Sequence, residues 1–286
     1  MKVVIEKYHG LGNDYFVFDP NKNELKLTPE NVRLICNKNF GMGSDGVLEG
    51  PIMTEKGIFV KIWNPDGSEA TQSGTGVRIF AKYLKDEGYV QKKRFKLLTS
   101  SRDVEVSFLN ESGSRLRVSM GKLSFWSDEI PVTGERREVI NEDMLFGRTL
   151  YPTTCVSIGN PHCIIPMREI SKPLVCKIGN FSEVARCFPN RINTQLLQVV
   201  DSEHIKIEIF ERGAGYTIAS GTGACAAAGA AYRLGLTGPK MTVQMPGGEL
   251  QVEICDDWEV FMTGDVFYIG RISLSTEFTE MLRCAE

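Results

Sequence analysis

One motif occurs twice in this chain, as Ala70-Thr71-Gln72-Ser73-Gly74-Thr75-Gly76 and as Thr217-Ile218-Ala219-Ser220-Gly221-Thr222-Gly223. The two copies are 147 positions apart, counted from residue 73 to residue 220, and the same offset pairs Asn13 with Asn160 and residues 63–64 with residues 210–211. Similarity at a fixed offset is typical of an internal duplication. We therefore expect two like halves, each of which places a short polar side chain at the start of a helix.

The composition is that of a soluble globular protein, with 42% hydrophobic and 24% charged residues in a chain of 286. A net charge of −3, spread without long blocks of one sign, argues against nucleic acid and anionic membranes as partners. No apolar run is long enough for a membrane-spanning helix or a signal peptide, so we expect a cytoplasmic protein. The eight cysteines contain no Cys-x-x-Cys pair, which predicts neither a metal site nor a disulfide framework, and we expect most of them to be buried.

Short strands dominate the expected secondary structure, and several alternate apolar with polar residues, as residues 206–209 do. This pattern predicts mostly antiparallel sheets, with helices over residues 30–37, 76–86 and 223–234. The third helix has small residues on every side, which suits the centre of a curled sheet, whereas the second is more amphipathic and is expected to be less completely wrapped. The fold class is therefore α/β (α+β). The expected domains are residues 1–118, with 268–286 returning to them, and residues 119–267.

Each Ser-Gly-Thr-Gly lies where a strand or loop leads into a helix, so Ser73 and Ser220 are expected at or near the N-cap. The backbone N–H groups of the first helical turn, at Gly74 and Thr75 and at Gly221 and Thr222, then have no partner within the helix. With the positive end of the helix dipole they form a site for an anion such as a carboxylate. A purely structural role of the two serines as helix caps is the alternative.

Five further motifs carry a resemblance to a known family. They are His9-Gly10-Leu11-Gly12-Asn13-Asp14, the run that begins at Asn64, Gly159-Asn160-Pro161-His162, the segment from Phe188 to Asn193, and Glu211-Arg212-Gly213 with the small-residue helix after it. Together they resemble diaminopimelate epimerase over nearly the whole chain. The resemblance implies two pseudo-symmetric domains, each a mostly antiparallel sheet curled around a central helix, with the active site between them.

The resemblance also implies an activity that needs neither pyridoxal phosphate nor a metal: interconversion of LL- and meso-diaminopimelate by two cysteines that act as base and acid on opposite faces of Cα. Ser73 and Ser220 occupy the two cysteine positions. A serine hydroxyl is far less acidic than a thiol, whose pKa of about 8.5 is readily lowered at a helix N-terminus. Because both sites differ while their surroundings are intact, our hypothesis is an inactivated double Cys-to-Ser form that binds substrate.

By the same resemblance, the substrate is held by Asn13, Asn64, Asn160, Asn193, Glu211 and Arg212. An arginine can bind a carboxylate with two parallel hydrogen bonds, and a glutamate can accept from an ammonium group. His9 and His162 are expected to make structural hydrogen bonds. Family members are commonly homodimers, and we expect the same here.

Three alternatives stay open at this point. Thr75 and the pair Thr194-Gln195 differ from the residues common in the family, which leaves racemisation of another amino acid, such as histidine, as a second reading. A natural non-catalytic amino-acid-binding protein is a third. A relative of the phenazine-biosynthesis isomerases, which use carboxylates, is disfavoured by the start at His9 and by the Glu211-Arg212-Gly213 run.

Overall fold

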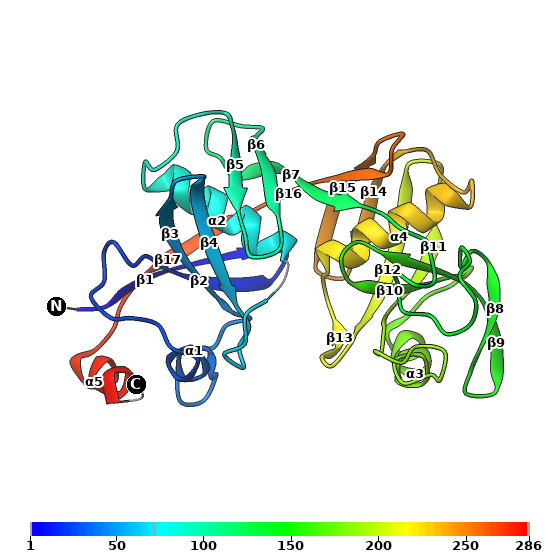
Figure 1. Cartoon of the computed structure of the whole chain (residues 1–286), viewed down its shortest axis with the longest axis horizontal. Helices are drawn as coiled ribbons and strands as arrows, with labels where there is room; N and C mark the ends of the chain where they lie inside the picture. The colour runs from blue at the N-terminus through cyan, green and yellow to red at the C-terminus, as the bar shows by residue number, and fades with distance from the viewer. Residues whose placement is uncertain (1, 71–72, 285–286) are drawn as a thin grey trace. The chain divides into compact units, whose positions relative to one another are not determined.

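The computed structural model describes residues 2–70 and 73–284. Thr71 and Gln72 of the first motif copy, and residues 285–286 of the expected C-terminal segment, lie outside this description. The chain divides into two compact units, one of residues 1–118 and 264–286 and the other of residues 119–263. It passes from one unit to the other within β7 (Arg115–Lys122) and again within β16 (Glu259–Asp265) (Figure 1).

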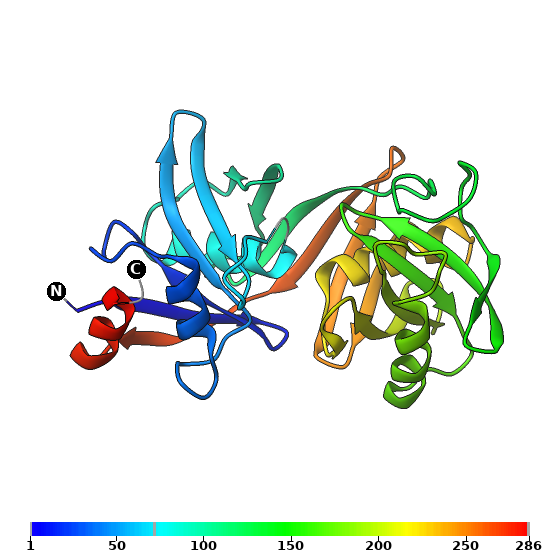
Figure 2. The ribbon, with the colours of Figure 1, turned by 60° about the horizontal axis from the view of Figure 1, so that its bottom comes forward.

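The first unit is a sheet whose neighbouring strands follow the order β17, β1, β2, β3, β4, β5, β6 and β7. Two of these pairings, β2 with β3 and β4 with β5, are parallel, and the other pairings between neighbouring strands in this order are antiparallel. Figure 2 shows β3 and β4 as a long hairpin. The strands are β1 (Val4–Gly10), β2 (Asn13–Phe18), β3 (Val47–Thr54), β4 (Gly57–Trp63), β5 (Arg94–Leu98), β6 (Asp103–Phe108), β7 and β17 (Phe267–Ser273).

Three helices accompany this sheet. α1 (Pro29–Cys36) starts with a capping box, in which Thr28 accepts from the Asn31 N–H and the Asn31 side chain accepts from the Thr28 N–H. The Asn31 side chain also donates to the Leu282 carbonyl over 2.6 Å, which ties α1 to α5 (Thr276–Cys284). α2 (Gly74–Asp86) packs against the inner strands.

The second unit repeats this plan in the order β8, β9, β10, β11, β12, β14, β15 and β16, with the short β13 on β12. The parallel pairs are again two, β10 with β11 and β12 with β14. Its helices are α3 (Lys172–Ser182) and α4 (Gly221–Arg233). The strands are β8 (Glu142–Phe146), β9 (Thr149–Ser157), β10 (Pro161–Pro166), β11 (Asn193–Val199), β12 (His204–Glu211), β13 (Gly215–Thr217), β14 (Lys240–Met245), β15 (Gly248–Ile254) and β16.

The strand register follows the duplication seen in the sequence. In the first unit Val47 pairs with both Phe16 and Trp63, and in the second Thr194 pairs with both Cys163 and Phe210. Each residue of the second set lies 147 positions after its counterpart in the first. The expected fold class, two similar and mostly antiparallel sheets around central helices, is confirmed.

The central helices are both deeply buried. In α4 the small residues Ala224–Ala228 and Ala230–Ala231 are all fully buried, as their composition predicts. A Cβ at Gly229 would come 2.3 Å from Leu123, so this helix is thin because its neighbours leave no room. The expectation that α2 is less completely wrapped was wrong, because its large side chains, among them Phe80 and Tyr83, fill the space that the sheet leaves.

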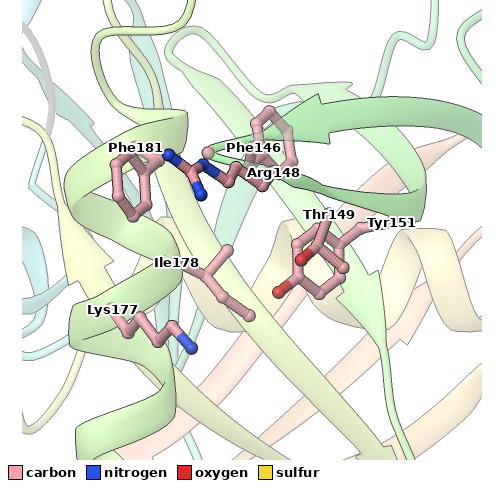
Figure 3. Close-up of a pocket in the computed structure, with 8 residues that line it drawn as sticks. Phe146, Arg148, Thr149, Tyr151, Lys177, Ile178 and Phe181 are labelled. Atoms are coloured by element: carbon pink, nitrogen blue, oxygen red, sulfur yellow. The ribbon is translucent and has the colours of Figure 1, made fainter.

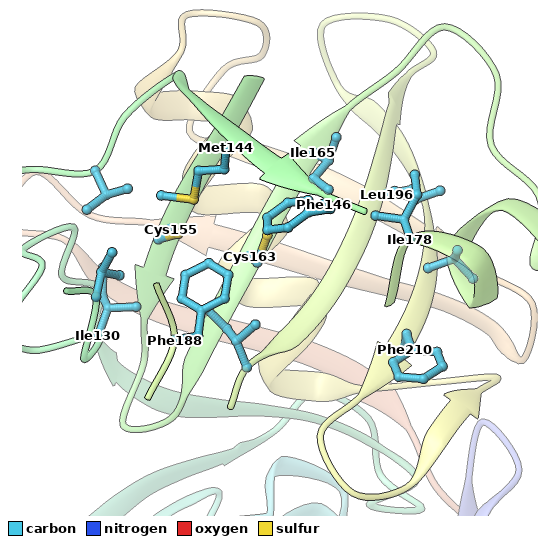
Figure 4. Packing of buried hydrophobic residues seen from close by; sticks show 14 residues of the cluster. Ile130, Met144, Phe146, Cys155, Cys163, Ile165, Ile178, Phe188, Leu196 and Phe210 are labelled. Carbon is cyan, nitrogen blue, oxygen red and sulfur yellow. The ribbon is translucent and has the colours of Figure 1, made fainter. Parts of the chain in front are cut away.

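Each unit has its own apolar core. The cluster in Figure 4 belongs to the second unit, where the Phe146 and Phe188 rings lie 6.1 Å apart and pack beside Ile178 of α3 and Leu196 of β11. The corresponding cluster of the first unit includes Phe16 and Phe18 of β2 and Val32 and Ile35 of α1. Among the described residues, no helix is long and apolar enough to cross a membrane.

Five elements and the expected burial of the cysteines differ from the sequence analysis. The helices α3 and α5 and the strands β3, β8 and β13 were not expected. In β3 the Gly50-Pro51 pair reads as a turn, and the structure accommodates it at a register shift between Glu49 and Ile52, where a proline is tolerated in a strand. The eight cysteines are free, but only half of them, Cys36, Cys155, Cys163 and Cys225, are buried.

Candidate functional site

Ser73 is the N-cap of α2. Its backbone is extended, its carbonyl accepts from the Val77 N–H at 3.0 Å, and its Oγ accepts from the Gly76 N–H at 2.9 Å. This is the geometry that serine favours before a helix, since its side chain satisfies one of the first-turn N–H groups. The backbone N–H groups of Gly74 and Thr75 belong to the same first turn, and both residues are buried.

Tyr15 is a member of this site that the sequence analysis missed. Its phenolic oxygen lies 3.1 Å from Ser73 Oγ, and either group can be the donor. The ring is held against Gly46, where a Cβ would come 2.6 Å from a ring carbon. The one sequence signal that could have pointed to Tyr15 is the duplication. The offset of 147 positions pairs residue 15 with His162, which lies in one of the motifs.

Ser220 is the N-cap of α4 in the same manner. Its Oγ accepts from the Gly223 N–H at 3.2 Å, and its carbonyl accepts from the Ala224 N–H at 2.9 Å. The residue is almost completely buried, with 8% of its surface exposed. The expectation that Ser73 and Ser220 lie at helix N-caps is confirmed by both geometries.

A chain of polar side chains connects the start of α4 to β10 and β11. Asn160 donates to Thr222 Oγ1 over 3.3 Å, and its Oδ1 lies 3.0 Å from His162 Nε2. His162 Nδ1 in turn lies 3.1 Å from the Gln195 amide. These contacts bring Thr222, Asn160 and His162 together and confirm that His162 makes structural hydrogen bonds. The binding roles of Thr222 and Asn160 stay predictions.

Burial lowers the pKa of His162 from 6.5 to about 4, with the positive charge of Arg212 as a smaller cause in the same direction. The ring is therefore neutral at pH 7 and carries a single N–H. Both contacts join a ring nitrogen to an amide oxygen, so with its single N–H His162 donates to only one of the two amides. Within the described residues, no hydrogen bond joins a histidine to either serine.

The segment Glu211-Arg212-Gly213 is held by two side chains from other elements. Asn193 Oδ1 accepts from the Arg212 N–H at 3.0 Å, while Asn193 Nδ2 donates to the Pro161 carbonyl at 2.8 Å. Glu183, which the sequence analysis did not single out, accepts from the Gly213 N–H at 2.7 Å and pairs with Arg191 at 2.9 Å. Arg212 itself is exposed and uses one guanidinium N–H on the Asn190 carbonyl.

Asn13 and Asn64 of the first unit lie on different elements: Asn13 begins β2, and Asn64 directly follows β4. Asn13 donates to Asp45 at 2.8 Å, and Asn64 donates to Ser68 at 2.9 Å. In the described part of the chain neither side chain has a hydrogen bond to Ser73. The structure thus shows both asparagines in hydrogen bonds with their own surroundings, and their expected role in binding stays a prediction.

Solved structures with the same arrangement of elements define the fold. A phenazine biosynthesis protein of the PhzF family from Bacillus anthracis superimposes with a TM-score of 0.65 over 96% of this chain and 99% of that chain, at 16% identity. A probable proline racemase from Agrobacterium radiobacter K84 gives a TM-score of 0.69 over 96% and 93%, at 14% identity. The chain therefore has the duplicated α/β fold that these proteins share.

Sequence comparison is more specific. The family model described as diaminopimelate epimerase matches residues 5–126 and 154–269. The chain is 46% identical over 272 residues to "Diaminopimelate epimerase 2" of Nostoc sp. (strain PCC 7120 / SAG 25.82 / UTEX 2576), covering 95% of both chains. It is 38% identical over 268 residues to a diaminopimelate epimerase of Synechococcus elongatus, covering 92% of this chain and 95% of that one. The chain belongs to the diaminopimelate epimerase family.

Proposed function

We propose that this protein is a cofactor-independent epimerase scaffold that binds diaminopimelate and has Ser73 and Ser220 at the two acid/base positions. The observation that carries the proposal is the paired geometry at the two helix starts, in a chain that belongs to the diaminopimelate epimerase family. In the two-base reaction, one position removes the Cα proton and the other supplies a proton to the opposite face. The proposed reaction interconverts LL- and meso-diaminopimelate, a step of lysine biosynthesis.

The helix starts support this chemistry because they favour negative charge. A substrate carboxylate that accepts from the first-turn N–H groups of Gly74 and Thr75, or of Gly221 and Thr222, has part of its charge neutralised. This stabilises the carbanion that develops next to the carboxylate when Cα–H is removed. The N-cap oxygens of Ser73, which is partly buried, and of Ser220, which is buried, lie at the start of the same turns.

Turnover by the chain as it stands is expected to be very slow. Proton abstraction needs an anionic or strongly assisted oxygen, and a serine at a helix start has neither a thiol's acidity nor, here, an imidazole hydrogen-bonded to it. We propose that Ser73 and Ser220 stand where an active family member has cysteine, and that the change leaves substrate binding intact.

For the rest of the substrate we propose Asn13, Asn64, Asn160, Asn193, Glu211 and Arg212 as binding residues. The exposed Arg212 guanidinium suits a carboxylate, and Glu211 suits an ammonium group. By the same family resemblance we propose a cytoplasmic homodimer. A natural amino-acid-binding protein is the second candidate, favoured by one observation: both serines are well-formed helix caps and need no thiol for that role.

Proton exchange at Cα tests the proposal. The unchanged protein and the Ser73→Cys/Ser220→Cys variant are incubated in D2O with LL-diaminopimelate and, separately, with L-histidine, and loss of Cα–H and isomer composition are followed by NMR and chiral chromatography. We expect exchange and epimerisation of diaminopimelate by the cysteine variant alone, with both proteins binding it. Absence of exchange in the cysteine variant, together with tight binding by both proteins, would support the binding protein; exchange of histidine alone would identify a different racemase.

A further inference from the structure

A cavity of about 530 Å³ lies in the second unit, between the β8–β9 hairpin and α3 (Figure 3). Its volume falls within the range of small-molecule sites, about 300–1,000 Å³. Neither Ser220 nor any other residue of the candidate functional site lines it. An occupant of this cavity therefore belongs to a different site from the substrate of the proposed epimerase.

The walls of the cavity are largely aromatic. Phe146 and Tyr151 from the hairpin stack with ring centroids 6.0 Å apart, and Phe181 from α3 stands opposite them with half of its surface exposed. Ile178 forms the apolar floor between the two sides. Such surfaces favour a flat apolar body, because aromatic rings pack against one another in stacked or edge-on arrangements.

Two cations line the same space. Arg148 on the hairpin turn and Lys177 on α3 are both exposed, and neither has an ion-pair partner among the residues that the structure describes. No acidic side chain lines the cavity, and the hydroxyl groups of Thr149 and Tyr151 are further donors. The polar groups therefore favour an anion, and the planar Arg148 guanidinium suits a carboxylate in particular.

The hairpin residues that form one wall of the cavity lie outside the ranges that match the family model. The model matches residues up to 126 and from 154, so the hairpin residues 146–151 lie outside the matched ranges. Gly147 allows this wall to close on the helix, because it has a left-handed φ of 66° and a Cβ there would come 3.2 Å from the Phe181 ring. The cavity is thus formed between a segment outside the matched ranges and α3, which lies within them.

We propose that this cavity is a second ligand site, which takes a small aromatic carboxylate. The ring lies between Phe146, Tyr151 and Phe181, and the carboxylate accepts from Arg148 and Lys177. The inference goes beyond the proposed epimerase function and does not depend on it, since the binding is measured without turnover.

The probe is 3-phenylpropionate, titrated into the full-length protein by isothermal titration calorimetry. The pocket variant is Arg148→Gln/Lys177→Gln. The matched control is Lys92→Gln/Arg186→Gln, which removes the same charge from two exposed cations that do not line the cavity. The neutral probe 3-phenylpropanamide tests the need for the anion, decanoate tests the need for the ring, and excess meso-diaminopimelate tests for overlap with the helix starts.

We expect one site for 3-phenylpropionate, with affinity lowered about tenfold or more in the pocket variant and within about twofold of the parent in the control. The amide and decanoate should bind at least about tenfold more weakly, and diaminopimelate should not displace the probe. Hydrogen exchange should slow at residues 146–151 and 177–181 on binding. Equal binding by the pocket variant, equal binding of the amide or decanoate, displacement by diaminopimelate, or no binding up to about 10 mM would each overturn the proposal.

Discussion

The phenolic oxygen of Tyr15 lies 3.1 Å from the Oγ of Ser73, which also accepts from the Gly76 N–H at 2.9 Å. The Oγ of the equivalent Ser220 has the Gly223 N–H at 3.2 Å as its described hydrogen-bond partner. When Tyr15 donates, two hydrogen bonds converge on the Ser73 position and stabilise negative charge there. The two helix starts are therefore alike in backbone and unequal in chemistry.

Tyr15→Phe tests this inequality in the Ser73→Cys/Ser220→Cys background. Loss of a hydrogen bond to an anionic sulfur costs about 1.5 kcal/mol, so we expect Cα–H exchange at pH 7 to slow about tenfold. The acidic limb of the pH–rate profile should also move to higher pH, because thiolate formation at position 73 becomes harder. The measurement is the exchange rate in D2O as a function of pH.

Tyr89→Phe is the matched control for this experiment, because its hydroxyl donates to Asp19 at 2.7 Å in the same unit and does not contact Ser73. An unchanged pH profile in Tyr15→Phe, or the same shift in Tyr89→Phe, would remove Tyr15 from the proton chemistry.

Three serine N-caps of this chain form a graded series for stability. Ser73 caps α2 and also contacts Tyr15, Ser220 caps α4, and Ser171 precedes α3 without a side-chain cap hydrogen bond. Replacement by alanine should lower the free energy of unfolding by about 1–2 kcal/mol at Ser73, about 1 kcal/mol at Ser220 and less than about 0.5 kcal/mol at Ser171. Urea unfolding of the three variants at one pH gives the order.

The series has a built-in reference, because Ser171→Ala changes the same residue type at the same helical position. If Ser171→Ala costs as much as the other two substitutions, the cap hydrogen bonds at Ser73 and Ser220 contribute nothing measurable to folding.

His162 makes stability depend on pH. Its folded-state pKa is lowered to about 4 by burial, so between about pH 4 and 6.5 the unfolded chain binds a proton that the folded chain does not. Stability from this residue is fully present above pH 6.5 and is lost as the pH falls toward 4, by about 3 kcal/mol in total. Urea unfolding at a series of pH values between about 7.5 and about 4.5 measures how the free energy of unfolding changes with pH.

His162→Gln should flatten this part of the slope, although the variant is less stable overall. His204→Gln is the control, because His204 is partly exposed and pairs with Asp201 at 2.9 Å, and it should keep the slope of the parent. A parent protein whose stability does not change over this range would show that His162 is protonated in the folded state.

The sequence predicts the features that depend on local pattern or on the repeat. Ser73 and Ser220 are predicted as caps because Ser-Gly-Thr-Gly precedes a helical run, and α4 is predicted as buried because its small residues leave no polar face. The contact between Tyr15 and Ser73 is not predictable in this way, since it joins residues 58 positions apart through the tertiary fold. The strand β3 was missed because Gly50-Pro51 reads as a turn, and the bulge that accommodates it depends on pairing with β4.

The matched register of the two units has a consequence for the residues that now differ between them. A duplicated chain begins with identical halves, as a homodimer would have, and fusion into one polypeptide then allows each copy to mutate alone. Tyr15 and His162 occupy equivalent positions, yet one is a phenol that contacts Ser73 and the other is a neutral imidazole that binds two amides. Because the halves are linked in one polypeptide, these equivalent positions can hold two different residues, which a symmetric dimer of identical short chains could not do.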